Sequence, residues 1–186
     1  MSSSPRIPSP DPETLRGLGA GIAATCAGFN LRRASRAVTQ HFDHALAPVG
    51  LRSTQFTILS AMALAGSVTT VQLAEGLVVD RTTLTRNLKL LREAGLIEAR
   101  PSVVGRQIRF GLTESGRELL AQAIPHWQTA QDGIVEAFGA SDWPDMVREL
   151  GRLVHGTLAL AQAAEAATST NGRGTTSGPA CIPEFE

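Results

Sequence analysis

Cysteine is scarce in this sequence: its two cysteines, Cys26 and Cys181, lie near opposite ends of the 186 residues. Two isolated cysteines cannot build the disulfide framework of a small secreted domain, and they lack the C-x-x-C spacing of a zinc site. No apolar run approaches the roughly 20 residues of a membrane span. The first residues, MSSSPRIPSPDPE, also lack the apolar segment of a secretory signal. These absences predict a cytoplasmic protein with reduced thiols and no contact with membranes.

The sequence also lacks the common signatures of catalysis. It contains no glycine-rich phosphate loop, no nucleophile elbow and no H-E-x-x-H motif. His41 and His44 have a spacing that begins some metal sites, but no further Cys or His ligand lies close to them in the sequence. We therefore expect no enzymatic activity, no metal site and no cofactor.

What the chain does contain is a strongly basic stretch between Arg81 and Leu112. This window holds seven arginines and lysines against two glutamates, a net charge of +5, although the formal net charge of the whole chain is zero. Such local asymmetry is expected of a surface that binds phosphates. A solvated helix face would explain a run of charges equally well. The charge alone does not decide between these two interpretations.

The first half of this stretch has the pattern of an amphipathic helix. Asp80 is a suitable N-cap for the backbone N–H groups of Thr82 or Thr83, and Gly95 suits the left-handed conformation that ends many helices. The apolar positions recur at helical spacing and form one face, comprising Leu84, Leu88, Leu91 and Ala94. The other faces carry polar and basic residues, namely Arg81, Thr82, Thr85, Arg86 and Lys89.

The second half has the pattern of a β-hairpin, and a short helix precedes the whole stretch. Residues 96–100 are typical of a strand that Pro101 ends, and residues 106–112 alternate between apolar and polar positions. Thr69 and Gln72 have the spacing of a capping box that begins a short helix. Two helices joined by a few residues, followed by a hairpin, predict a winged helix-turn-helix. The fold class is therefore mainly α with a small β-hairpin wing.

The remaining sequence suggests helices on both sides of this unit. We expect a disordered or weakly ordered arm over residues 1–25 and a folded domain over 26–167. Within that domain the winged helix spans about 53–112, and long terminal helices at about 29–47 and 113–167 form a dimerisation region. Residues 168–186 are polar and glycine-rich, which predicts a flexible tail.

The predicted function is the recognition of double-stranded DNA. An α-helix fits the major groove, and the first turns of a recognition helix usually reach the bases. Arginine can bind guanine through two hydrogen bonds, and threonine can contact bases or phosphates. At the hairpin tip, Arg106 is placed to enter the minor groove. The predicted DNA-binding residues are Thr69, Thr70, Arg81, Thr82, Thr83, Thr85, Arg86, Lys89 and Arg106.

The sequence resembles the MarR family of bacterial regulators in three ordered segments, TTVQLAEGL, DRTTLTRNLKLLREAGLIEAR and RQIRFGLTESG. The resemblance implies a homodimer in which the first and the last two helices of each subunit interlock. It also implies a recognition helix at about Asp80–Ala94 and a wing at about Pro101–Arg109. Transcriptional control in the family is usually repression, relieved by a small ligand or by oxidation. One departure concerns the wing, where the family's Asp-x-Arg is replaced by Val104, Gly105 and Arg106.

Two kinds of signal are compatible with these residues. Arg32 and Arg36 share a helix face, and their like charges favour an anionic partner such as an aromatic carboxylate, although an acid of a second subunit or a DNA phosphate also fits. With His41 and Trp127 they form the candidate effector site. Cys26 lies where the peroxide-sensing branch of the family keeps its cysteine, but alignment puts the sensing position at Gly28 and the chain has no tyrosine. Cys26 is thus either a redox sensor or an inert thiol. A winged helix that binds protein or ligand without DNA is the remaining alternative.

Overall fold

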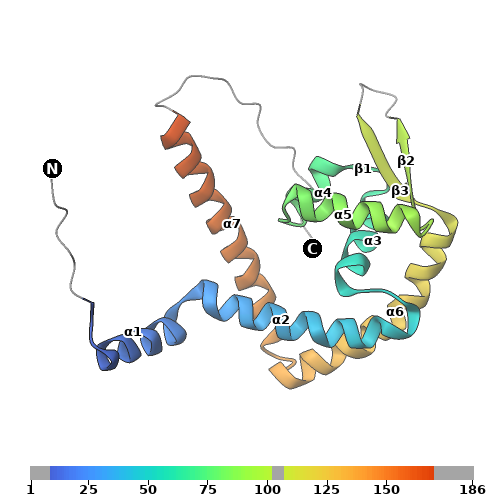
Figure 1. Ribbon diagram of the computed structural model, residues 1–186. Coiled ribbons are helices and arrows are strands. Elements are labelled where there is room, and N and C mark those ends of the chain that lie inside the picture. The colour runs from blue at the N-terminus through green and yellow to red at the C-terminus, as the bar shows by residue number, and fades with distance from the viewer. Residues whose placement is uncertain (1–8, 102–106, 170–186) are drawn as a thin grey trace.

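The computed structural model describes residues 9–101 and 107–169, which form helices around a small antiparallel sheet (Figure 1). In chain order the helices are α1 (Pro12–Thr25), α2 (Ala27–Leu46), α3 (Ser53–Ala65), α4 (Thr70–Gly76), α5 (Arg81–Glu93), α6 (Glu114–Phe138) and α7 (Trp143–Ser169). A short 3-10 turn, η1 (Ala47–Val49), follows α2. The strands are β1 (Val68–Thr69), β2 (Ile97–Pro101) and β3 (Ile108–Leu112).

The winged helix-turn-helix consists of α3, α4, α5 and the sheet. The strand order is β1-β3-β2, and both pairings are antiparallel. The predicted capping box at α4 is present, because the Thr69 hydroxyl accepts from the Gln72 backbone N–H while the Gln72 side chain accepts from the Thr69 N–H. Gly95 follows Ala94, the C-cap of α5, and adopts φ +72°, as the sequence predicted for the end of that helix.

The core of this unit is made of aliphatic side chains that α3, α5, β2 and α6 turn inward. Leu59, Leu84, Leu91 and Ala123 are fully buried, and Ile97 is buried beside them. Leu46, at the end of α2, belongs to the same cluster and therefore ties the winged helix to the long helices. This arrangement holds α5 by one face and leaves its opposite face at the surface.

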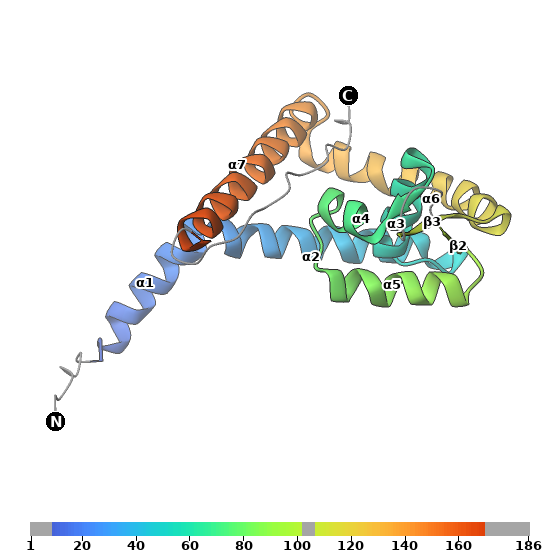
Figure 2. The same cartoon turned by 90° about the horizontal axis from the view of Figure 1, so that it is seen from above.

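The long helices extend away from the winged helix. Both views show α1 extending away from the winged helix at the N-terminal end of α2, and α7 running clear of the sheet (Figures 1 and 2). From Val147 to Thr168, every residue of α7 is exposed in the single subunit, including large apolar residues such as Leu150, Leu153 and Leu158. No helix among residues 9–101 and 107–169 is long and apolar enough to cross a membrane.

The structure differs from the sequence predictions at three places. Residues 12–25 form α1 where we expected a disordered or weakly ordered arm. Asp11 caps this helix and Pro12 occupies its first turn, although none of its residues is buried. The strand β1 was not predicted, since its two residues are extended only through pairing with the distant β3. Pro101 lies within β2 instead of following it, opposite Ile108 at the last pair of the ladder.

Candidate nucleic-acid interface

The solvent-exposed face of α5 carries most of the polar and basic residues that the sequence analysis predicted to bind DNA. Leu84, Leu88 and Leu91 are buried beneath this helix. Because these positions recur every three to four residues, they fix which side of the helix faces solvent. The exposed side carries Arg81, Thr82, Thr83, Thr85, Arg86 and Lys89.

Asp80 sets the beginning of this helix. Its carboxylate accepts a hydrogen bond of 2.8 Å from the Thr83 backbone N–H. Hydrogen bonds from the Thr83 side chain and backbone lower the pKa of Asp80 below its ordinary value. The cap holds the first turn of α5 in place, and Arg81, Thr82 and Thr83 belong to that turn.

The exposed side chains of α5 differ in how far they are engaged. The Thr85 hydroxyl donates to the Arg81 carbonyl over 2.6 Å, and Lys89 lies 3.8 Å from Glu93. Within the described residues no ion pair involves Arg81 or Arg86. These two arginines are therefore available to an external anion, whereas Lys89 must first leave Glu93.

At the start of α4, Thr69 and Thr70 differ in burial and in hydrogen bonding. Thr69 is 8% exposed, and its hydroxyl is engaged with Gln72 in the cap of α4. Thr70 is the first residue of α4 and is partly exposed. Thr69 thus positions α4, while Thr70 is the better placed of the two for a phosphate. Between the helices, Val78 adopts φ +50°, a conformation that is uncommon for a β-branched residue.

The predicted wing contact at Arg106 lies outside the described residues, as do Val104 and Gly105. The strands that lead to it are described: β2 and β3 pair from Ile97 opposite Leu112 to Pro101 opposite Ile108. Arg109, on β3, donates through Nη2 to the Ser67 carbonyl and through Nε to the Ser67 hydroxyl. The wing is thereby tied to the residue just before β1 and α4.

The four candidate effector residues each have partners of their own or are exposed. Trp127 of α6 stacks on Phe56 with ring centroids 6.0 Å apart, as part of the packing around the core. His41 of α2 makes a hydrogen bond of 3.0 Å with the Ala130 carbonyl of α6. Arg32 donates to the Gly28 carbonyl of its own helix, and Arg36 is exposed on α2. None of these four residues lines the pocket that Arg100, Arg109 and Arg117 form beside the sheet.

Cys26 lies at the junction of α1 and α2, where it is the C-cap of one helix and the N-cap of the other. Cys26 is exposed, and its thiol is free. The Asn30 amide donates to the carbonyls of Ala23 and Cys26 and so fixes the angle between the two helices. Among the described residues no group of His, Cys, Asp and Glu is arranged to hold a metal ion.

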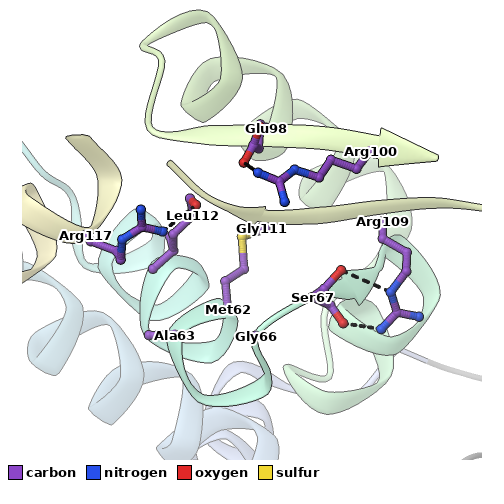
Figure 3. Close-up of a pocket in the computed structure, with 10 residues that line it drawn as sticks. All are labelled: Met62, Ala63, Gly66, Ser67, Glu98, Arg100, Arg109, Gly111, Leu112 and Arg117. Carbon is purple, nitrogen blue, oxygen red and sulfur yellow. Dashed lines mark hydrogen bonds and ion pairs between the residues drawn. The ribbon is translucent and has the colours of Figure 1, made fainter. Parts of the chain in front are cut away.

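Sequence reasoning did not group three arginines that the fold brings to one pocket. Arg100 of β2, Arg109 of β3 and Arg117 of α6 line a pocket of about 330 Å³ behind the wing (Figure 3). Strand alternation places Glu98 and Arg100 on one face of β2. The sequence could have indicated this shared face from the alternation alone. The register that places Arg109 opposite Arg100 is seen only in the structure.

Comparisons with known proteins converge on one family. A sequence model described as the MarR family matches residues 49–108. The M. tuberculosis transcriptional regulator MosR, solved in complex with DNA, is 38% identical and has a TM-score of 0.61; the match covers 77% of this chain and 98% of that chain. The transcriptional repressor CouR, bound to a 23-mer DNA duplex, is 26% identical with a TM-score of 0.66, covering 72% and 96% of the two chains. A mutant MarR from E. coli, complexed with operator DNA, shares the fold at 21% identity, with a TM-score of 0.65 and coverage of 71% and 96%.

Proposed function

The chain belongs to the MarR family of DNA-binding transcriptional regulators, which are not enzymes, and we propose that it is a ligand-responsive repressor that binds operator DNA as a homodimer. The observation that carries the proposal is the exposed face of α5. This face joins two arginines without carboxylate partners among the described residues to three threonines in the first turns of a capped helix. A helix presented in this way fits the major groove, and its arginines can read guanine.

The DNA-bound relatives support the choice of ligand. MosR, CouR and the E. coli MarR mutant were each solved with DNA, and this chain covers 95% or more of each of those chains. We infer that α5 is the recognition helix here, and that Thr70 and the backbone amides at the start of α4 contact phosphates.

The homodimer is supported by the apolar surface of the terminal helices. Val154 and Leu158 of α7 and Phe29 and Val38 of α2 are 40% to 42% exposed in the single subunit. Apolar surface of this extent on two long helices marks a protein–protein interface. Because a two-fold dimer presents two recognition helices, the operator is expected to be a pseudo-palindrome with half-sites about one helical turn apart.

The regulatory part of the proposal is that a small anionic molecule relieves repression in the cytoplasm. Arg36 on α2 has no carboxylate partner among the described residues, and its guanidinium suits an aromatic carboxylate. Since His41 of α2 is hydrogen-bonded to the Ala130 carbonyl of α6 and Trp127 of α6 stacks on Phe56 of α3, a ligand at this surface would act between the long helices and the DNA-binding unit.

A gel-shift titration with DNA from upstream of the protein's own gene tests the proposal. The apparent affinity should fall steeply between two salt concentrations, because bound phosphates release counterions. Specific binding should also exceed that of a shuffled fragment of equal length by at least about a thousandfold. Equal affinity for both fragments would show that the winged helix does not read sequence.

A further inference from the structure

The β2–β3 ladder places two arginines directly opposite each other. Arg100 and Arg109 are Cα partners in the antiparallel register. Like charges at such a position repel each other and destabilise the pairing unless an anion lies between or beside them. The neighbouring pair on the same face, Glu98 opposite Gly111, supplies one carboxylate, which forms an ion pair with Arg100.

The ion pairs around this face leave one positive charge without a carboxylate. Arg100 is paired with Glu98, and Arg117 is paired with Glu114. Within residues 9–101 and 107–169, the partners of Arg109 are only the neutral carbonyl and hydroxyl of Ser67. Arg109 is partly buried, so solvent screens its charge less than that of a fully exposed side chain. The site has the charge to accept one monoanion.

The pocket beside Arg109 has room for a small apolar group attached to that anion. The pocket of about 330 Å³ has an apolar floor made by Met62, Ala63 and Leu112. Figure 3 shows Arg109 and Arg117 on opposite sides of Met62. Gly111 adds no side chain to the pocket, and a Cβ at this position would be in van der Waals contact with the Gly66 carbonyl oxygen, 3.4 Å away.

We propose that this pocket, with Arg109 as its principal ligand, binds an oxyanion carrying a single negative charge, such as a small-molecule carboxylate or a DNA phosphodiester. Within the described residues no hydrogen bond involves Nη1 of Arg109, which therefore has donors for the anion. The guanidinium forms charge-assisted hydrogen bonds with such a group. For a small molecule, the proposal rests on the proposed ligand-responsive function and adds a second anion site, at the wing, to the one proposed at Arg36.

Occupation of the site would act on the DNA-binding unit through Ser67. Arg109 holds the carbonyl and hydroxyl of this residue, and the α4 N-cap, Thr69, follows two residues later. An anion that draws the guanidinium away from Ser67 would loosen the joint between the wing and α4. A phosphodiester bound at the same place would instead fix the wing base to the DNA backbone.

The test compares the full-length wild type with three variants in a titration with sodium benzoate, at constant ionic strength and without DNA. Arg109→Gln removes the charge and should weaken benzoate binding about tenfold or more, because charge-assisted hydrogen bonds are the strong ones. Ser67→Ala disturbs the same contact but keeps the charge, so it should retain binding. Arg148→Gln is the matched control, since it removes an equal charge from the exposed surface of α7, outside the pocket, and should bind benzoate as the wild type does.

A second arm identifies a phosphodiester as the occupant. If Arg109 of each subunit binds a DNA phosphate, Arg109→Gln should reduce the slope of log affinity against log salt by about 1.8 for the dimer, since each lost phosphate contact lowers it by about 0.9, and Arg148→Gln should not. The inference is overturned if the wild type does not bind benzoate more tightly than Arg109→Gln and the salt slopes of Arg109→Gln and Arg148→Gln agree. If benzoate binding depends on Arg109 but the wild type binds no DNA, the pocket stands and the proposed function fails.

Discussion

Arg86 is the side chain on which sequence-specific recognition should depend most. It is exposed on α5, has no carboxylate partner among the described residues and lies two turns from the Asp80 cap. Arg86→Ala should abolish specific operator binding, because a bidentate contact to guanine contributes about 1–3 kcal/mol of discrimination per site and a dimer carries two such sites. Fluorescence anisotropy with operator and shuffled DNA measures this difference.

The control for Arg86 is Arg148→Ala, which removes a solvent-exposed arginine from α7. Its guanidinium lies 2.7 Å from Asp145, and exposed pairs of this kind contribute little to stability. Both variants should remain folded and dimeric. Operator affinity in Arg86→Ala equal to that of Arg148→Ala would remove Arg86 from the recognition surface.

Asp80 makes the stability of the recognition helix dependent on pH. Hydrogen bonds from the Thr83 side chain and backbone lower the pKa of this carboxylate in the folded protein. A carboxyl whose folded pKa lies below its unfolded pKa stabilises the fold above the unfolded value, and this contribution is lost as the pH falls through the folded pKa. The contribution should therefore be present in full at neutral pH, begin to be lost below about pH 4 and be gone only below the folded pKa.

Two substitutions at Asp80 separate capping from charge. Asp80→Ala should lower the Tm by a few degrees at pH 7, because the Thr83 N–H loses its acceptor. Asp80→Asn keeps an oxygen that can accept from the Thr83 N–H, so its Tm at pH 7 should be close to that of the wild type. Because the amide does not titrate, the stabilisation by this cap should not be lost at low pH. Thermal melts at pH 7 and pH 3 check both expectations; a Tm difference between wild type and Asp80→Ala that is unchanged at pH 3 would contradict them.

At the scale of elements, the joint between α5 and α6 is fixed by backbone proximity. The Thr113 hydroxyl donates to the Gly95 carbonyl and accepts from the Gly116 N–H, so it caps α6 and joins it to the turn after α5. A Cβ at Gly116 would lie only 2.0 Å from the Leu96 carbonyl oxygen. Because the obstacle is backbone and not a flexible side chain, the two segments would have to separate.

Gly116→Ala should therefore destabilise the protein by about 1–3 kcal/mol or more, in the manner of an overpacked core. Gly133→Ala, in the same helix, meets nothing within 4 Å and should stabilise it by roughly 0.5–1 kcal/mol, since alanine favours a helix over glycine. Urea denaturation of the two variants measures both changes. Equal stabilities would mean that α6 does not approach Leu96 as closely as the structure shows.

The elements that the sequence predicted well are those whose causes are local. The Thr69–Gln72 box, the Asp80 cap and Gly95 each act within a few residues, and they set the bounds of α4 and α5 correctly. The strand β1 and the contact between Arg109 and Ser67 depend on residues about 40 positions apart, which periodicity cannot reveal. The pocket behind the wing could not be predicted either, because its lining residues come from segments that are distant in the sequence. For residues 1–25 the composition predicted a disordered or weakly ordered arm, whereas Asp11 caps α1 and Pro12 occupies its first turn in the structure.

At the scale of the whole molecule, α7 shows why a second subunit is expected. Its salt bridges, Asp145 with Arg148 and Glu149 with Arg152, lie along one side of the helix. The large apolar residues, including Leu150, Val154 and Leu158, recur at helical spacing on another side and are exposed in the single subunit. A helix of 27 residues with this pattern requires a partner for its apolar side.

Placing charge on that side should separate the subunits. The double variant Val154→Glu with Leu158→Glu should be monomeric in analytical ultracentrifugation, because a carboxylate buried in an apolar interface without a partner is strongly unfavourable. His155→Glu puts the same side chain on the polar side of α7 and should remain dimeric. Operator affinity should fall about a hundredfold or more in the double variant, since each half-site is then bound independently. A double variant that stays dimeric and binds the operator like His155→Glu would exclude this face of α7 from the interface.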